Sequence, residues 1–202
     1  TLDTNVLASA LIGGGSITKN GTGTWVLTGT NGHGGGVEVS SGVLQAGANG
    51  GSGSLGIGTV SVAAGAAIDF QRTGTLTVPG AINGAGTVIQ NGSGRVILAN
   101  NNGYTGGTTI NAGVLQVGNG GGSGSLFSPG PIVNNATLAW DEAGPGTYSD
   151  TLTGVGLFNK LGAGTLLFDG DGSGFSGSTV IAGGGPKLAG PLGSGVFGAG
   201  GW

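Results

Sequence analysis

The 202-residue sequence predicts an all-β chain whose short strands stack into a solenoid, and three observations lead to this fold class. Glycine contributes 53 residues, far above its usual share of roughly 7 %. Short β-branched or apolar runs are separated by Gly, Asn and Ser, and no useful length shows the spacing of a helix. The chain also repeats itself, in units of about 70 residues. Because stacked units place like residues above like, the combination favours a solenoid over a sandwich or a propeller.

The repeat is visible when the sequence is shifted against itself. A shift of 71 places residues 15–27 on 86–98, and a further 70 reach 156–168. Residues 36–45 likewise overlay 107–116, and a third copy at 177–183 then loses register at Gly184. We therefore divide the single domain 1–202 into a partial unit (1–10), two full units (11–81 and 82–151) and a truncated unit (152–202).

Each predicted strand is a short apolar or β-branched run that ends at a turn residue. In the first unit these runs are residues 24–28, 37–39, 43–45, 59–62, 68–70 and 76–78, followed by Ile82. The opening residues 2–12 also align as strand, turn and strand. Glycine suits the corners because it accepts positive φ and close backbone approach. A unit of this length suits about three coils of ~23 residues, and about nine coils at ~4.8 Å predict a rod on the order of 40 Å long.

Composition excludes several functional classes. Lys and Arg total 5, Asp and Glu total 8, and the net charge is −3, so the chain lacks the basic surface that nucleic acid or an anionic membrane requires. It has no cysteine, which excludes disulfides and thiolate metal sites. No apolar run reaches the ~18 residues of a membrane-spanning helix. No charged and apolar leader precedes the first residues, which predicts no signal peptide and a processed or excised piece.

Four groups of residues are candidates for a chemical role. His33, the single histidine, aligns with Tyr104, with Phe175 nearest it in the third copy; this predicts a substituted aromatic at a turn rather than a general base. Asp169 and Asp171 resemble one fragment of a calcium loop, but calcium β-rolls need their nonapeptide in tandem, so turn formation is favoured.

The acidic pair Asp141 and Glu142 lies in a non-repeated insert, and its adjacent side chains should point to opposite faces of a strand. We predict a solvated loop there, with Lys160 as the nearest cation in sequence.

Four aromatic residues could form a sugar-stacking face: Trp25, Phe70, Trp140 and Trp202. Repeat alignment predicts core positions for the first three, whereas Trp202 has no matched partner. The sequence thus predicts no catalytic, cofactor-binding or metal-binding residue and no enzyme.

The repeated positions resemble a known family, the autotransporter passenger-associated β-strand repeat. Its pattern of paired glycines, a lysine, and alternating apolar residues is met in the third unit by Gly154, Gly156, Lys160, Gly162, Gly164, Leu166 and Phe168. In the second unit it is met by Gly84, Gly86, Gly92, Gly94, Val96, Leu98, Asn102, Tyr104, Gly106, Gly107, Thr108, Ile110, Gly113 and Leu115. In the first it is met by Gly13, Gly15, Lys19, Gly21, Gly23, Trp25, Leu27, Asn31, Gly35, Gly36, Val39, Gly42 and Leu44.

The resemblance implies a right-handed parallel β-helix that belongs to the passenger of a Gram-negative autotransporter, secreted or displayed at the cell surface. It implies a non-enzymatic stalk, adhesin or self-association surface, with a role in virulence, that helps the passenger fold during export. Partners would be host or bacterial surface components or a second copy, and the full-length protein would carry a C-terminal β-barrel translocator.

Two alternatives remain open at the level of sequence. The first is an enzyme that acts on polysaccharide, which rests on analogy to other β-helices and on the Asp141–Glu142 insert. The second is a head-to-tail filament, because neither end of the chain shows a polar capping segment.

Overall fold

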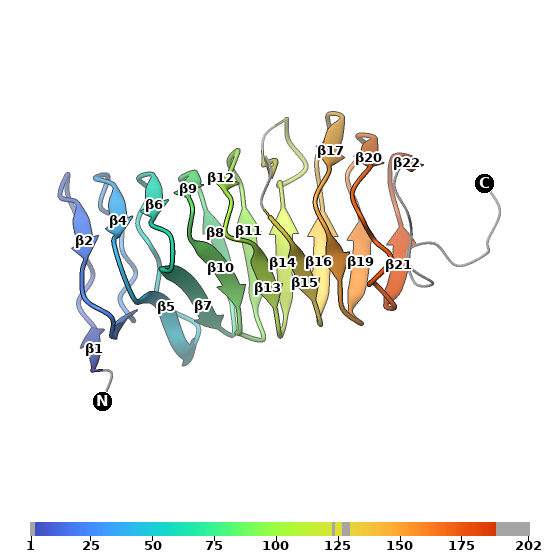
Figure 1. Ribbon diagram of the computed structural model, residues 1–202. Coiled ribbons are helices and arrows are strands. Elements are labelled where there is room, and N and C mark those ends of the chain that lie inside the picture. The colour runs from blue at the N-terminus through green and yellow to red at the C-terminus, as the bar shows by residue number, and fades with distance from the viewer. Residues whose placement is uncertain (1–2, 123, 127–129, 189–202) are drawn as a thin grey trace.

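The computed structural model describes residues 3–122, 124–126 and 130–188. These residues form a parallel β-solenoid of about nine turns, without any helix, which runs along one axis from the N-terminal to the C-terminal side (Figure 1). The predicted fold class is confirmed. Among the described residues no helix is long and apolar enough to cross a membrane.

Every coil contributes to up to three faces, which we call face 1, face 2 and face 3. Face 1 is an eight-stranded sheet: β1 (Thr4–Leu7), β3 (Thr24–Leu27), β5 (Val43–Gly50), β7 (Ala67–Arg72), β10 (Thr87–Gln90), β13 (Thr108–Ile110), β15 (Ile132–Asn134) and β18 (Leu152–Thr153). Face 2 is a six-stranded sheet: β8 (Thr75–Val78), β11 (Arg95–Leu98), β14 (Val114–Val117), β16 (Thr137–Trp140), β19 (Leu157–Lys160) and β21 (Ser178–Ile181).

Face 3 consists of a five-stranded sheet and a three-stranded sheet that continues along the same side of the rod (Figure 1). The first contains β2 (Ile17–Lys19), β4 (Val37–Val39), β6 (Val60–Val62), β9 (Ile82–Gly84) and β12 (Gly103–Tyr104). The second contains β17 (Gly146–Tyr148), β20 (Leu166–Phe168) and β22 (Pro186–Leu188). The predicted strands are present close to their expected ends, except that residues 43–45 open a longer strand. In the opening segment only β1 forms, and no strand follows it before β2.

The average coil is slightly shorter than the sequence predicted. Seven register steps on face 1 lead from Asn5 to Leu152, and their mean length lies below the expected one. The steps are also uneven. Those from Val43 to Ala67 and from Thr108 to Ile132 are the longest because each includes a loop.

Coil length and repeat length therefore do not match, and the sequence repeat advances around the rod. The equivalent residues Ile17, Val88 and Phe158 lie on β2 of face 3, β10 of face 1 and β19 of face 2. Along the chain, face 3 is followed by face 1 and face 1 by face 2. One unit thus spans about three coils, as expected, and a further third of a coil. Each copy of the motif faces a different side.

The turn glycines keep their role on every face. Gly42, Gly113 and Gly184 all have positive φ, between 60° and 70°. A Cβ at any of them would collide with a backbone oxygen of the neighbouring coil. Glycine is required there for both conformation and space. The structure also corrects the third copy: Gly184 is the counterpart of Gly42, one position later than the sequence alignment placed it.

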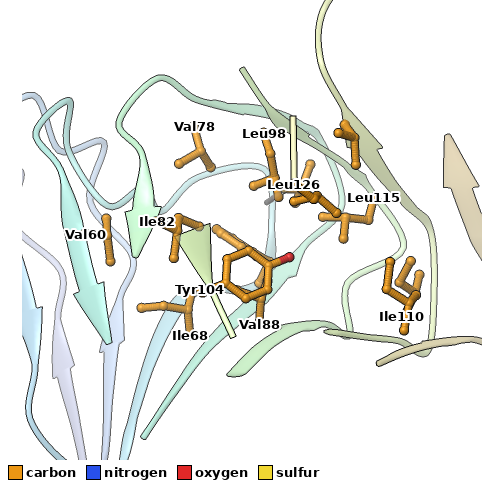
Figure 2. Close-up of a cluster of buried hydrophobic side chains, with 14 of the residues drawn as sticks. Val60, Ile68, Val78, Ile82, Val88, Leu98, Tyr104, Ile110, Leu115 and Leu126 are labelled. Carbon is orange, nitrogen blue, oxygen red and sulfur yellow. The ribbon is translucent and has the colours of Figure 1, made fainter. Parts of the chain in front are cut away.

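Inward-facing apolar side chains fill the space between the faces. The equivalent positions Leu27, Leu98 and Phe168 are all buried although they lie on three different faces. Figure 2 shows the interior around Tyr104, where Ile68, Ile82 and Val88 surround the phenol ring. Because each strand pairs only with strands about one coil away, the core is built from contacts between neighbouring coils.

Candidate functional site

The basic or amide residue of each motif is buried and caps the turn that follows it. Lys19 is fully buried, and its Nζ donates to the carbonyl oxygens of Gly21 at 2.6 Å and Ser41 at 2.9 Å. At the equivalent positions Gln90 Nε2 donates to the Gly92 carbonyl at 2.8 Å, and Lys160 Nζ donates to that of Gly162. These side chains satisfy the carbonyls of glycine corners on three different faces.

Burial lowers the pKa of both motif lysines. For Lys19 desolvation is the cause. For Lys160 desolvation also dominates, and the negative charges of Asp141 and Glu142 oppose it. A lysine whose ammonium group is held by backbone carbonyls inside the rod is not available to a ligand, so we assign these residues to the scaffold.

The motif asparagine links three successive coils. Asn102 Oδ1 accepts from the Ile82 backbone N–H at 2.9 Å on one side, and the Asn102 backbone N–H donates to the Ser125 carbonyl at 2.8 Å on the other. Asn31 repeats the arrangement: its Oδ1 accepts from the Leu11 N–H at 2.8 Å and its Nδ2 donates to the Ser54 carbonyl at 2.6 Å. The two asparagines occupy the same position in successive units and act as equivalent brackets.

His33 occupies the interior position of the motif aromatic. Tyr104 and Phe175, its repeat neighbours, are fully buried, and His33 is 2 % exposed. The Tyr104 hydroxyl forms a 2.7 Å hydrogen bond with the hydroxyl of Thr108. The residue at the matching place beside His33 is Val37, and neither imidazole nitrogen has a hydrogen-bond partner among the described residues. The predicted aromatic substitution is seen, and nothing in that part of the chain orients the ring as a general base.

The two residues of the acidic pair have different hydrogen-bond partners. Asp141 Oδ2 accepts from Gln116 Nε2 at 3.0 Å, whereas Glu142 Oε2 accepts from the indole N–H of Trp140 at 2.9 Å. The prediction of a solvated loop is wrong for Glu142, which is 6 % exposed. Desolvation raises its pKa, while the Trp140 hydrogen bond and the Lys160 charge act in the opposite direction. The two carboxyl groups therefore have separate hydrogen-bond partners.

The remaining sequence candidates are structural within the described residues. Asp171 Oδ1 accepts from the Ser173 N–H at 2.9 Å and closes a turn; hydrogen bonds with Ser173 lower the pKa of Asp171. In the described part of the chain no three His, Asp or Glu residues gather as metal ligands.

The aromatic residues divide between core and surface. Phe70 and Trp140 are buried, as predicted, and Trp25 is only partly buried against the core with Lys19 Nζ 5.8 Å from its ring centroid. Trp202 lies outside the described residues. The structure therefore does not assemble the three described aromatics into one sugar-stacking face.

A polar groove on face 3 was not predicted from the sequence. It has a volume of about 380 Å³ and crosses β2, β4 and β6 as far as β9. Its floor contains four outward-facing residues in register on adjacent strands: Thr18, Glu38, Ser61 and Asn83. Each of these residues comes from a different coil, so no local motif marks them.

Comparison with known proteins shows which family the repeat matches. Three segments match the family described as Passenger-associated-transport-repeat: residues 17–46, 88–117 and 158–185. The matches begin on β2, β10 and β19, that is, on the three different faces. The chain is also 36 % identical over 173 residues to a protein named "Adhesin BmaC autotransporter" from Brucella suis biovar 1 (strain 1330). That similarity covers 75 % of this chain and 5 % of the relative. No solved structure matches.

Proposed function

Because three segments of the chain belong to the passenger-associated-transport-repeat family, we propose that it is a structural and adhesive segment of an autotransporter passenger, secreted or displayed at the surface of a Gram-negative cell. The observation that carries this proposal is that the three matched segments build one continuous solenoid. The similarity to a protein named an adhesin supports the adhesive part. The proposal implies a translocator domain elsewhere in the full-length protein.

The physical form of the segment suits a rod that holds or spaces an adhesive surface. About nine turns at ~4.8 Å per turn give a length on the order of 40 Å. The buried cation Lys19 and the asparagine brackets tie several coils to their neighbours. Such ties resist bending of one coil against the next, because bending would break buried hydrogen bonds.

We also propose that the repeat aids folding of the passenger after export. Strands inside each sheet pair with the strand of the preceding coil and with that of the following coil, so a folded coil supplies a sheet edge on which the next coil forms. Folding would therefore advance coil by coil as the chain emerges. The lack of cysteine is compatible with this route, since no disulfide can close the chain before it is exported.

We propose a non-enzymatic role because the acidic pair Asp141 and Glu142 engages separate internal partners. The check is hydrolysis or elimination of acidic and neutral glycans by the purified chain. Turnover that is lost when Asp141 and Glu142 are replaced by their amides would contradict this part of the proposal.

The main test uses the full-length protein displayed on bacteria. Residues 3–188 are removed in frame, surface display is measured with an antibody to another part of the passenger, and adherence to host cells is counted. We expect adherence to fall with display retained, and unchanged adherence would refute the adhesive role. Replacement of residues 3–188 by an unrelated solenoid segment of equal length distinguishes a spacer from a binding surface. The replacement should restore adherence if the segment is a spacer, but not if it is a binding surface.

A further inference from the structure

We propose that the groove on face 3 binds a neutral, hydroxyl-rich glycan chain laid across the strands. This inference rests on the proposed adhesive function and names the site and the class of ligand within it. The site is formed by the outward-facing row of Thr18, Glu38, Ser61 and Asn83 and by the hydroxyls of Ser16 and Thr59 beside it.

The groove has the form of a track. Thr18 pairs with Glu38, Glu38 with Ser61 and Ser61 with Asn83 in the register of four adjacent parallel strands. Neighbouring strands are ~4.8 Å apart, so polar side chains recur at short, regular steps along the rod. All four side chains are exposed, while their apolar strand neighbours such as Val37 and Val60 point into the core. A linear ligand can therefore contact each coil in turn.

The chemistry of the lining selects hydroxyl groups. Ser and Thr hydroxyls and the Asn83 amide each donate and accept hydrogen bonds, and the Glu38 carboxylate accepts several hydrogen bonds. Ser40 Oγ donates to Glu38 Oε1 at 3.2 Å and helps to orient that carboxylate. Sugar hydroxyls, which both donate and accept, match this set of partners, and a carboxylate accepts sugar hydroxyls with charge-assisted bonds.

Two other ligand classes fit less well. Among the described residues no lysine, arginine or histidine lines the groove, so an anionic glycan would meet Glu38 without a compensating cation. A peptide that binds by strand addition needs free backbone groups at a sheet edge. The strands under the groove are already paired with one another, with β4 and β6 hydrogen-bonded on both sides. Away from the outer edge of β2, the terminal strand of this sheet, only side chains are available to the ligand.

The groove is confined to one place because the repeat rotates around the rod. The unit-by-unit counterparts of Glu38 are Thr109 on face 1 and Val180 on face 2. Neither carries a carboxylate, and Val180 is an exposed apolar residue. The motif copies therefore do not reproduce the groove, and a ligand that recognises it would bind this part of the rod once.

The direct test titrates defined oligosaccharides into the isotope-labelled chain and monitors the amide chemical shifts. The neutral probes are cellohexaose, laminarihexaose and chitohexaose, and the anionic probe is a heparin hexasaccharide. We expect at least one neutral probe to shift the resonances of Thr18, Glu38, Ser61 and Asn83 together. Absence of such shifts with all neutral probes, or shifts with heparin alone, would overturn the proposal, as would binding of an extended peptide in their place.

Variants locate the site and separate this inference from the adhesive function. Glu38→Gln should weaken the neutral complex about tenfold by removing one charge-assisted bond. Thr77→Ala, an exposed change on β8 of face 2, is the matched control and should leave the affinity unchanged. Equal affinity of wild type and Glu38→Gln for the neutral probe would overturn the proposal that the groove is the binding site. If the displayed protein bearing Glu38→Gln adheres normally while the in-frame deletion does not, the groove fails and the adhesive function stands.

Discussion

The asparagine bracket offers a quantitative test of how neighbouring coils hold together. Replacement of Asn102 by Ala removes the acceptor of the buried Ile82 N–H and the side-chain donor to the Asn100 carbonyl. An orphaned buried N–H destabilises by about 1–3 kcal/mol, and loss of an ordinary hydrogen bond by about 0.5–1.5 kcal/mol. We therefore expect the free energy of unfolding to fall by about 2–3 kcal/mol in the coils that contain Asn102 and its neighbours.

The measurement should report on individual coils, because a solenoid can open locally without global unfolding. Native-state hydrogen exchange resolves the Ile82 amide itself. A loss of about 2 kcal/mol corresponds to roughly thirtyfold faster exchange at this amide. Urea unfolding followed by circular dichroism gives the global value for comparison.

Two further variants complete the design. Asn31→Ala should affect the Leu11 amide in the same way, since its bracket has the equivalent partners one unit earlier. Asn111→Ala removes a hydrogen bond between exposed side chains and should change stability by less than about 0.5 kcal/mol. Unchanged protection of Ile82 in Asn102→Ala would refute the argument that the bracket carries coil-to-coil stability.

Three other predictions concern a corner, a buried acid and the interior phenol. Gly80→Ala would drive a Cβ into the Gly58 carbonyl oxygen of the preceding coil and should destabilise the fold by more than about 2 kcal/mol in urea unfolding; Gly14→Ala, with open space around it, should not. Burial raises the pKa of Glu142 above its ordinary value of 4.5, so the folded state binds the proton more readily, and stability falls as pH rises from about 4.5 through the raised pKa. Glu142→Gln should reduce that slope in melting curves taken from about pH 4 to 8, and an identical slope in both proteins would contradict it. Tyr104→Phe should lower stability by about 1 kcal/mol through loss of the hydroxyl pair with Thr108, and a double-mutant cycle with Thr108→Val should show that the two losses are not additive.

Much of the fold could be predicted because the repeat makes local signals agree. The spacing of Gly42 and Gly113 predicts corners, and both are corners with positive φ. The alignment makes Leu27, Leu98 and Phe168 equivalent apolar positions of the repeat, and all three are buried. These predictions depend only on the chain near each residue and on its equivalents.

Other features depend on distances that the local sequence does not encode. The rotation of the repeat follows from a mean coil that is shorter than one third of a unit. The steps are uneven, as the short one from Trp25 to Leu44 and the long one from Leu44 to Ile68 show, so the coil length cannot be read from the local sequence. Glu142 is buried because it accepts a hydrogen bond from the indole of Trp140 and because the neighbouring coil packs against it. An acidic pair before a Gly-Pro-Gly turn does not predict these contacts. The groove joins residues from four coils, so only the register of the strands reveals it.

The extra third of a coil in each unit couples the number of units in a passenger to the direction in which its distal part points. Loss or duplication of one unit changes the length by roughly 16 Å, from three and a third steps of ~4.8 Å, and turns everything beyond it by about a third of a revolution. A gain or loss of three units, about ten coils, changes reach by roughly 48 Å and restores the original azimuth. Recombination between such repeats would therefore rotate the part of the passenger beyond them at the same time as it lengthens or shortens the rod. Variants that differ by three units should be the ones that conserve a contact with a fixed orientation.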